Sequence, residues 1–177
     1  MRQAVVLVGL LLSGCASMFP TVVPEANSSE YTPTGEVQAN RYGATFDAVR
    51  VRSPTCNLSK RTDGSWGGTL GDHAIDVSVT PDRIRGVNFV LSKTDSTADR
   101  LIITGQMDGK IYRFELGPKD ALVRTPTMAL TYPNRQVENG VTYYGPMKEL
   151  ALKGEAGGDA ANVAWPQIAL ALLAAFQ

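Results

Sequence analysis

The sequence predicts a mainly β fold: an antiparallel meander forming a barrel or a sandwich, with a C-terminal α-helix. Three observations support this prediction. From Trp66 onward, apolar and polar residues alternate in short runs that turn residues separate. Residues 101–116 form two such runs around Asp108-Gly109, the favoured pair for a two-residue hairpin turn. Residues 166–176 are rich in alanine and leucine, which are strong helix formers.

The chain begins with a short apolar segment that is typical of an export signal. Arg2 precedes an unbroken apolar run over residues 4–12, far shorter than the roughly 20 residues that span a bilayer. Residues 12–15, Leu-Ser-Gly-Cys, then resemble the lipobox of bacterial lipoproteins. This resemblance covers residues 1–15 and implies cleavage before Cys15, with fatty acyl groups such as palmitate on its sulfur and its new amino group. The alternative is an ordinary secretory signal that is cleaved elsewhere.

The lipobox resemblance also implies a location. Several acyl chains on Cys15 make a lasting anchor, because each buried methylene contributes about 0.8 kcal/mol. Ala16, rather than an aspartate, follows Cys15, and the sorting rule of such lipoproteins then implies the periplasmic face of the outer membrane. We therefore expect a signal peptide at 1–14, the lipidated Cys15 with a flexible, proline-containing tether at 15–40, and one β-rich domain at 41–177.

The first half of the domain contains several expected strands. Within residues 41–56 the alternation changes phase, which predicts a strand with a bulge or a short helix. Residues 75–79 alternate strictly, Pro81-Asp82 predicts a turn, and residues 83–91 predict a returning strand with a bulge near Gly86. A polar loop follows at 93–99. In the hairpin at 101–116, pairing outward from the turn places Tyr112 opposite Gly105 and leaves one face apolar.

The second half continues with a turn at 117–120 and short strand candidates at 121–125, 127–132, 141–144 and 148–153. Residues 154–159 interrupt this pattern. The C-terminal helix is expected over about 164–176, with Pro166 in its first turn. Because it is apolar nearly all round, we expect it to pack on the sheet or to plug a barrel end. Docking to a partner or to the membrane surface is the alternative.

A second resemblance rests on residues 64–66, Gly-Ser-Trp. Followed by about eight strands and a C-terminal helix, this tripeptide resembles the lipocalin plan, in which G-x-W opens the first strand of a barrel. The resemblance implies a barrel that encloses an apolar ligand, and some bacterial lipocalins are outer-membrane lipoproteins. The resemblance is an analogy of fold alone.

The charge balance argues against nucleic-acid binding, and the cysteine content argues against a disulfide within the mature chain. The chain has 17 Lys+Arg and 17 Asp+Glu residues, which argues against nucleic-acid binding, since that needs excess positive charge. With Cys15 acylated, Cys56 has no partner for a disulfide within the mature chain. We expect a buried Cys56 that acts as a small hydrophobe; an intermolecular disulfide is the alternative in an oxidising compartment.

The sequence contains no convincing catalytic or metal site, and we expect no cofactor. His73 is the single histidine, and neither G-x-S-x-G nor S-x-x-K occurs, so a surface or turn histidine is expected. One histidine and one free cysteine make a zinc site improbable. The loop from Asp95 to Asp99 offers too few oxygens for calcium.

Two other clusters have plain interpretations. The glycines at 154, 157 and 158 precede the helix without G-K-[ST], and neighbouring carboxylates would repel a phosphate, so they predict a linker. Several basic residues would touch anionic glycans or lipid headgroups if their strands were neighbours, but a solvated face is expected. These residues are Arg50, Arg52, Lys60, Arg61, Arg83 and Arg85.

The function predicted from these observations is a non-enzymatic binding or assembly module of the cell envelope. Its expected partners are the membrane, through the lipid anchor on Cys15, and an envelope protein. One alternative is a carrier whose barrel holds an apolar ligand against its aromatic residues and Met107. The other alternative is a hydrolase that uses His73 beside a serine and a carboxylate.

Overall fold

The computed structural model describes residues 31–39, 42–97, 99–157 and 164–176, which belong to one compact unit. The expected signal peptide and Cys15 lie outside these residues. The described strands form one 15-stranded sheet. They are β1 Gly35–Ala39, β2 Tyr42–Phe46, β3 Arg50–Ser53, β4 Cys56–Lys60, β5 Trp66–Leu70, β6 His73–Val79, β7 Arg83–Gly86, β8 Phe89–Lys93, β9 Leu101–Met107, β10 Lys110–Leu116, β11 Ala121–Arg124, β12 Ala129–Tyr132, β13 Asn134–Val137, β14 Val141–Gly145 and β15 Lys148–Gly154.

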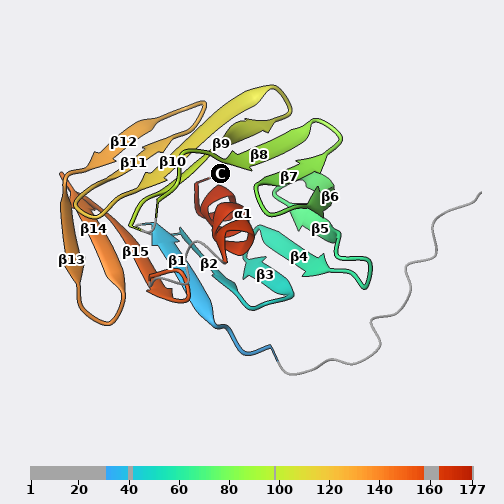
Figure 1. Cartoon of the computed structure of the whole chain (residues 1–177), viewed down its shortest axis with the longest axis horizontal. Coiled ribbons are helices and arrows are strands. Elements are labelled where there is room, and N and C mark those ends of the chain that lie inside the picture. The colour runs from blue at the N-terminus through green and yellow to red at the C-terminus, as the bar shows by residue number, and fades with distance from the viewer. Residues whose placement is uncertain (1–30, 40–41, 98, 158–163, 177) are drawn as a thin grey trace, which may run out of the picture. The chain divides into compact units, whose positions relative to one another are not determined.

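The sheet is an antiparallel meander that curls into a nearly closed barrel (Figure 1). Its order runs from β12 back to β1 and then through β15 and β14 to β13, so the first strand pairs with the last. The predicted fold class is confirmed. Within the described ranges, no helix is both long enough and apolar enough to cross a membrane.

At the seam of the nearly closed barrel, the chain passes from one edge strand to the other at Pro133. β12 pairs with β11, whereas β13, which follows directly along the chain, pairs with β14. A proline cannot donate a ladder hydrogen bond, so the change falls where the ladder is already interrupted. The edge strand β12 also approaches β14 across the seam: a Cβ on Gly145 of β14 would lie 2.8 Å from the Thr131 carbonyl oxygen of β12.

The central hairpin forms as predicted. Asp108 and Gly109 adopt φ angles of 50° and 75° at the turn, and Tyr112 pairs with Gly105. A Cβ on Gly105 would clash with the Val90 carbonyl oxygen of β8, so glycine is required by the close approach of the neighbouring strand. The face predicted to be apolar is buried, apart from Lys110 beside the turn and the partly exposed Gly105.

The helix α1, Trp165–Ala175, lies inside the ring of strands (Figure 1). Every residue from Ile168 to Leu173 is fully buried, and the helix packs against β1, β2 and β3. At its start, the Trp165 indole N–H donates a hydrogen bond of 2.7 Å to the Pro81 carbonyl in the β6–β7 turn. The expected internal packing of an all-round apolar helix is therefore confirmed.

Three details of the predicted strand pattern are wrong. The tether does not extend to residue 40, because residues 35–39 form β1 between β2 and β15. Within the described residues 42–56, the chain forms separate strands instead of the predicted bulged strand or short helix. These residues hold β2, β3 and the start of β4, and the Asp47 carboxylate accepts the Val49 N–H in the turn between the first two. The phase change near Gly86 is likewise a turn, with Asn88 at φ 55°, and not a bulge.

Candidate functional site

Two cavities open at one end of the barrel, which we call the mouth. The larger, of about 780 Å³, and the smaller, of about 540 Å³, share Tyr42 and Phe176. The larger is lined by Ala39, Tyr42, Met128, Leu130, Tyr144, Gly145, Met147, Lys148, Glu149, Ala175 and Phe176. The smaller is lined by Tyr42, Thr55, Gly71, Asp72, His73, Met107, Lys110, Tyr112, Thr125, Pro126, Thr127, Ala174 and Phe176.

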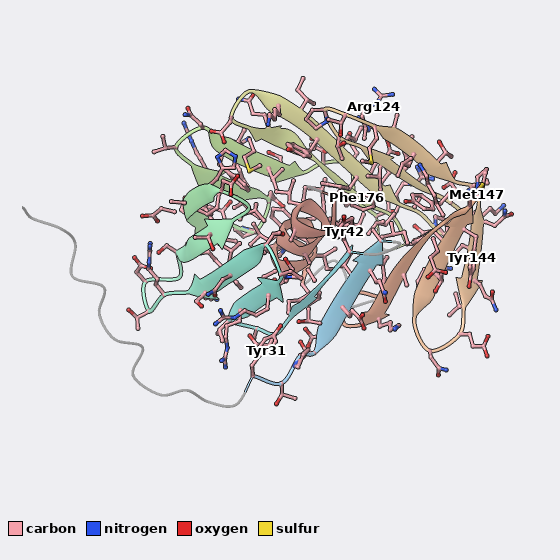
Figure 2. The ribbon with its side chains drawn as sticks, turned by 180° about the vertical axis from the view of Figure 1, so that it is seen from behind. Tyr31, Tyr42, Arg124, Tyr144, Met147 and Phe176 are labelled. Atoms are coloured by element: carbon pink, nitrogen blue, oxygen red, sulfur yellow. The ribbon has the colours of Figure 1, made fainter. Side chains whose placement is uncertain are left out.

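The rim of the larger cavity carries large hydrophobic side chains that are open to solvent. Tyr42 is 67% exposed, Met147 is fully exposed, and Met128 and Tyr144 are each exposed by more than a third. Of the eight exposed large hydrophobic residues in the described part of the chain, these four line one cavity. Figure 2 shows Tyr42 and Phe176 near the helix, and Met147 and Tyr144 on β14 and its turn. Such a grouping marks a binding surface rather than scattered surface residues.

Met147 is held at this rim in an unfavourable backbone conformation. Gly145 pairs with Lys148, which leaves Pro146 and Met147 as a two-residue turn, and Met147 has a φ of 58°. The second position of such a turn favours glycine or asparagine. A side chain with a Cβ costs about 1–2 kcal/mol in the left-handed region. Strain of this kind is concentrated at functional sites.

The floor of the mouth is the C-terminal turn of α1. Ala174, Ala175 and Phe176 line the two cavities. The last carbonyls of a helix lack partners within it. The Phe176 N–H reaches the carbonyls of Leu172 and Leu173, at 3.1 and 3.3 Å. Among the described residues, no hydrogen bond is donated to the carbonyls of Ala174, Ala175 or Phe176. The last turn of the helix also contains no basic residue. The floor therefore presents the negative end of the helix dipole.

His73 lies beside the smaller cavity, at the start of β6, where a strand beginning after a turn was predicted. Its Nδ1 is 3.0 Å from an Asp108 carboxylate oxygen, and both side chains are partly exposed. Within the described ranges, no serine, threonine or cysteine side chain is hydrogen-bonded to His73. His73 and Asp108 therefore form a pair of a base and an orienting carboxylate, but no described nucleophile is bonded to the histidine as a hydrolase of this kind would require.

Cys56 is buried, as predicted, and its thiol lies 3.9 Å from the Val51 carbonyl oxygen. Burial raises the pKa of the Cys56 thiol to about 12. A thiol that stays protonated is neither a nucleophile nor a metal ligand. In this position Cys56 is a core residue.

The six basic residues do not form one patch. Arg50 pairs with Asp47 at 3.3 Å and Arg61 with Asp76 at 2.7 Å. Arg52 is hydrogen-bonded to Asn57 on the neighbouring strand. Arg83 and Arg85 lie on β7, which β5 and β6 separate from β4 in the sheet. Within the described part of the chain, no group of histidine, cysteine and carboxylate side chains is placed to hold a metal ion.

Comparison of the chain with protein-family models, with curated proteins and with solved structures finds no match. Inference about function therefore depends on the chemistry of the mouth. For residues of the mouth, the sequence predicts a ligand-lining role for Met107 and the aromatic residues in the carrier alternative, and a catalytic role for His73 in the hydrolase alternative. Met147 carried a recognisable signal, since an apolar residue follows Pro146 where a turn favours glycine or asparagine.

Proposed function

We propose that this protein is a lipid-anchored binding module of the outer membrane, and that its mouth takes up an apolar ligand from the periplasm. The observation that supports this most is the larger cavity, about 780 Å³ in volume with exposed tyrosines and methionines at its rim. Small-molecule sites of roughly 300–1,000 Å³ are lined in this way.

The position of α1 favours the mouth over the barrel interior as the ligand site. In a carrier with an empty barrel, the ligand would occupy the space that Ile168 and its neighbours fill here. The mouth lies above the end of this helix, where the two cavities remain open. Its methionines suit this role because an unbranched thioether side chain adapts to ligands of different shape.

The described chain begins beside the end of β2 that lies away from the mouth. The Tyr31 hydroxyl donates a 2.9 Å hydrogen bond to Thr45, and the Arg50 guanidinium lies 5.3 Å from the Tyr31 ring centroid. Tyr31 and Tyr42 therefore lie toward opposite ends of β2 (Figure 2).

Metabolic labelling tests the anchor. Cells expressing the full chain and supplied with radioactive palmitate are expected to label the protein and to retain it in the outer-membrane fraction. Cys15→Ala is expected to abolish both results. Unlabelled wild-type protein, or label that persists in Cys15→Ala, would contradict the anchor.

Native mass spectrometry tests the binding function. The mature chain carrying Cys15→Ser, exported behind a cleavable signal and purified from the periplasm, is expected to carry an adduct of a few hundred daltons. Met147→Asp is expected to remove the adduct. The matched control is Val137→Asp, because Val137 is 64% exposed and pairs with Val141 beside the turn at the other barrel end.

The possible outcomes are distinct. A co-purifying protein without a small adduct would contradict ligand uptake and favour the assembly role. A chain that carries neither a small adduct nor a co-purifying protein in any preparation would contradict both ligand uptake and the assembly role. A measured hydrolysis that His73→Ala abolishes would overturn the non-enzymatic proposal.

A further inference from the structure

The geometry points to a ligand of particular chemistry at the mouth: an amphiphile whose head group is a protonated amine and whose tail is apolar. The head would lie against the C-terminal end of α1 and the tyrosine rings, and the tail along Met128 and Met147. This inference rests on the proposed function, because it names the kind of ligand that the same cavity accepts.

The first argument is the end of the helix. An α-helix carries the equivalent of roughly half a negative charge at its C-terminus, within its last turn. Here that end forms the floor of both cavities, through Ala174, Ala175 and Phe176. A lysine or arginine commonly offsets this charge, and none is present in the last turn. A hydrogen-bond donor with positive charge is therefore the head group that the floor favours.

The second argument is the aromatic lining. Tyr42 borders both cavities, Tyr144 borders the larger one and Tyr112 the smaller one. Cations are attracted to the faces of such rings, whereas carboxylates and phosphates are not. An ammonium head can contact these rings while its alkyl chain covers the methionines.

The charged side chains of the mouth nearly balance. Lys148 and Glu149 are neighbours on the rim of the larger cavity. Asp72 and Lys110 line the smaller cavity, where His73 is paired with Asp108. Because the formal charges of these lining residues sum to about zero, the helix end and the rings decide the preferred head group.

Calorimetric titration with three eight-carbon probes tests this inference. Octylammonium, octanol and octanoate share one tail and differ in the charge of the head group. The mature chain carrying Cys15→Ser is expected to bind octylammonium about tenfold more tightly than octanoate, with octanol in between. The carbonyl ¹³C resonances of Ala174, Ala175 and Phe176 are expected to shift with octylammonium and not with octanoate.

A matched pair of variants separates the head group from the tail. Tyr42→Leu retains an apolar side chain and removes the ring, so affinity for octylammonium is expected to fall about threefold while affinity for octanol stays constant. Tyr31→Leu makes the same change at the other end of the barrel and is expected to alter neither affinity.

The outcomes distinguish this inference from the proposed function. Equal affinity for the three probes, or tightest binding of octanoate, would overturn the ammonium preference and leave an apolar binding site. Failure of all three probes to bind, together with a bare chain in mass spectrometry, would overturn the proposed function itself.

Discussion

The ring of Phe176, directly after α1, lies 6.2 Å from the ring of Phe114 on β10. Phe114 in turn lies 6.5 Å from Tyr112, which lines the smaller cavity. This row of rings joins the end of the helix, which packs against β1–β3, to a strand elsewhere in the barrel wall. The floor of the mouth is therefore part of the hydrophobic core and is held in place by it.

Removal of core volume from the helix should destabilise the whole barrel. Ile168 is fully buried inside the ring, and Ile168→Ala is expected to lower the free energy of unfolding by about 2–5 kcal/mol. Urea denaturation measures this loss. Val87→Ala is the control, because Val87 is 92% exposed, and its effect should stay within about 0.5 kcal/mol. A similar small effect of Ile168→Ala would contradict the internal position of α1.

Met147→Asn should separate stability from binding. Asparagine tolerates the positive φ of residue 147 better than methionine does, so the free energy of unfolding is expected to rise by about 0.5–1 kcal/mol. Loss of the apolar side chain should at the same time weaken binding of octanol. Thermal unfolding and calorimetry measure the two effects. Val137→Asn, exposed at an unstrained position, should leave octanol binding unchanged and bring no gain in stability.

The two glycines of the central hairpin should respond differently to substitution. Gly105→Ala introduces a methyl group against the Val90 carbonyl and is expected to cost about 1–3 kcal/mol. Gly109 has open space around its Cβ position and a φ of 75° that asparagine tolerates, so Gly109→Asn should cost less than about 1 kcal/mol. Equal losses in chemical denaturation would argue against the close approach of β8 and β9.

The thiol of Cys56 should not react with thiol reagents until the protein unfolds. Because burial raises its pKa from 9.0 to about 12, the folded thiol stays protonated near neutral pH. Dithiobisnitrobenzoate is expected to label the Cys15→Ser chain at pH 8 only in denaturant. Rapid labelling of the folded protein would contradict the burial.

The raised pKa of the Cys56 thiol also predicts that the folded protein loses stability at alkaline pH. Above pH 9 the unfolded thiol loses its proton while the folded thiol keeps it, so stability is complete below pH 9 and falls as pH rises toward 12. Burial also raises the pKa of Tyr132 and Tyr143, which act in the same direction. Urea midpoints at pH 7 and pH 10 should show the loss, and Cys56→Ala should reduce its size. A Cys56→Ala chain with an unchanged pH dependence would contradict the contribution of the thiol.

Local chemistry made the central hairpin and the helix predictable. Asp108-Gly109 fixes a turn with positive φ, and the turn fixes the pairing of the two strands. The helix is specified by its composition and by Pro166 in its first turn. In both cases the residues that determine the structure lie next to one another in the chain.

Non-local pairing made β1 and the mouth unpredictable. β1 is only five residues long, and it is a strand because β2 and β15 lie on either side of it. Thr34 and Glu155, which are hydrogen-bonded across the same closure, are 121 residues apart. The mouth residues Tyr42, Met147 and Phe176 are equally scattered, and only closure of the ring brings them together.

The position of α1 has a consequence for biogenesis. The segment that fills the barrel follows all the described strands in chain order, so these strands are synthesised before the residues that complete the barrel interior. A nascent chain halted before Trp165 would have a wall around an empty centre, with no buried surface to hold it shut. Truncation of the chain before Trp165 should therefore leave a species prone to proteolysis.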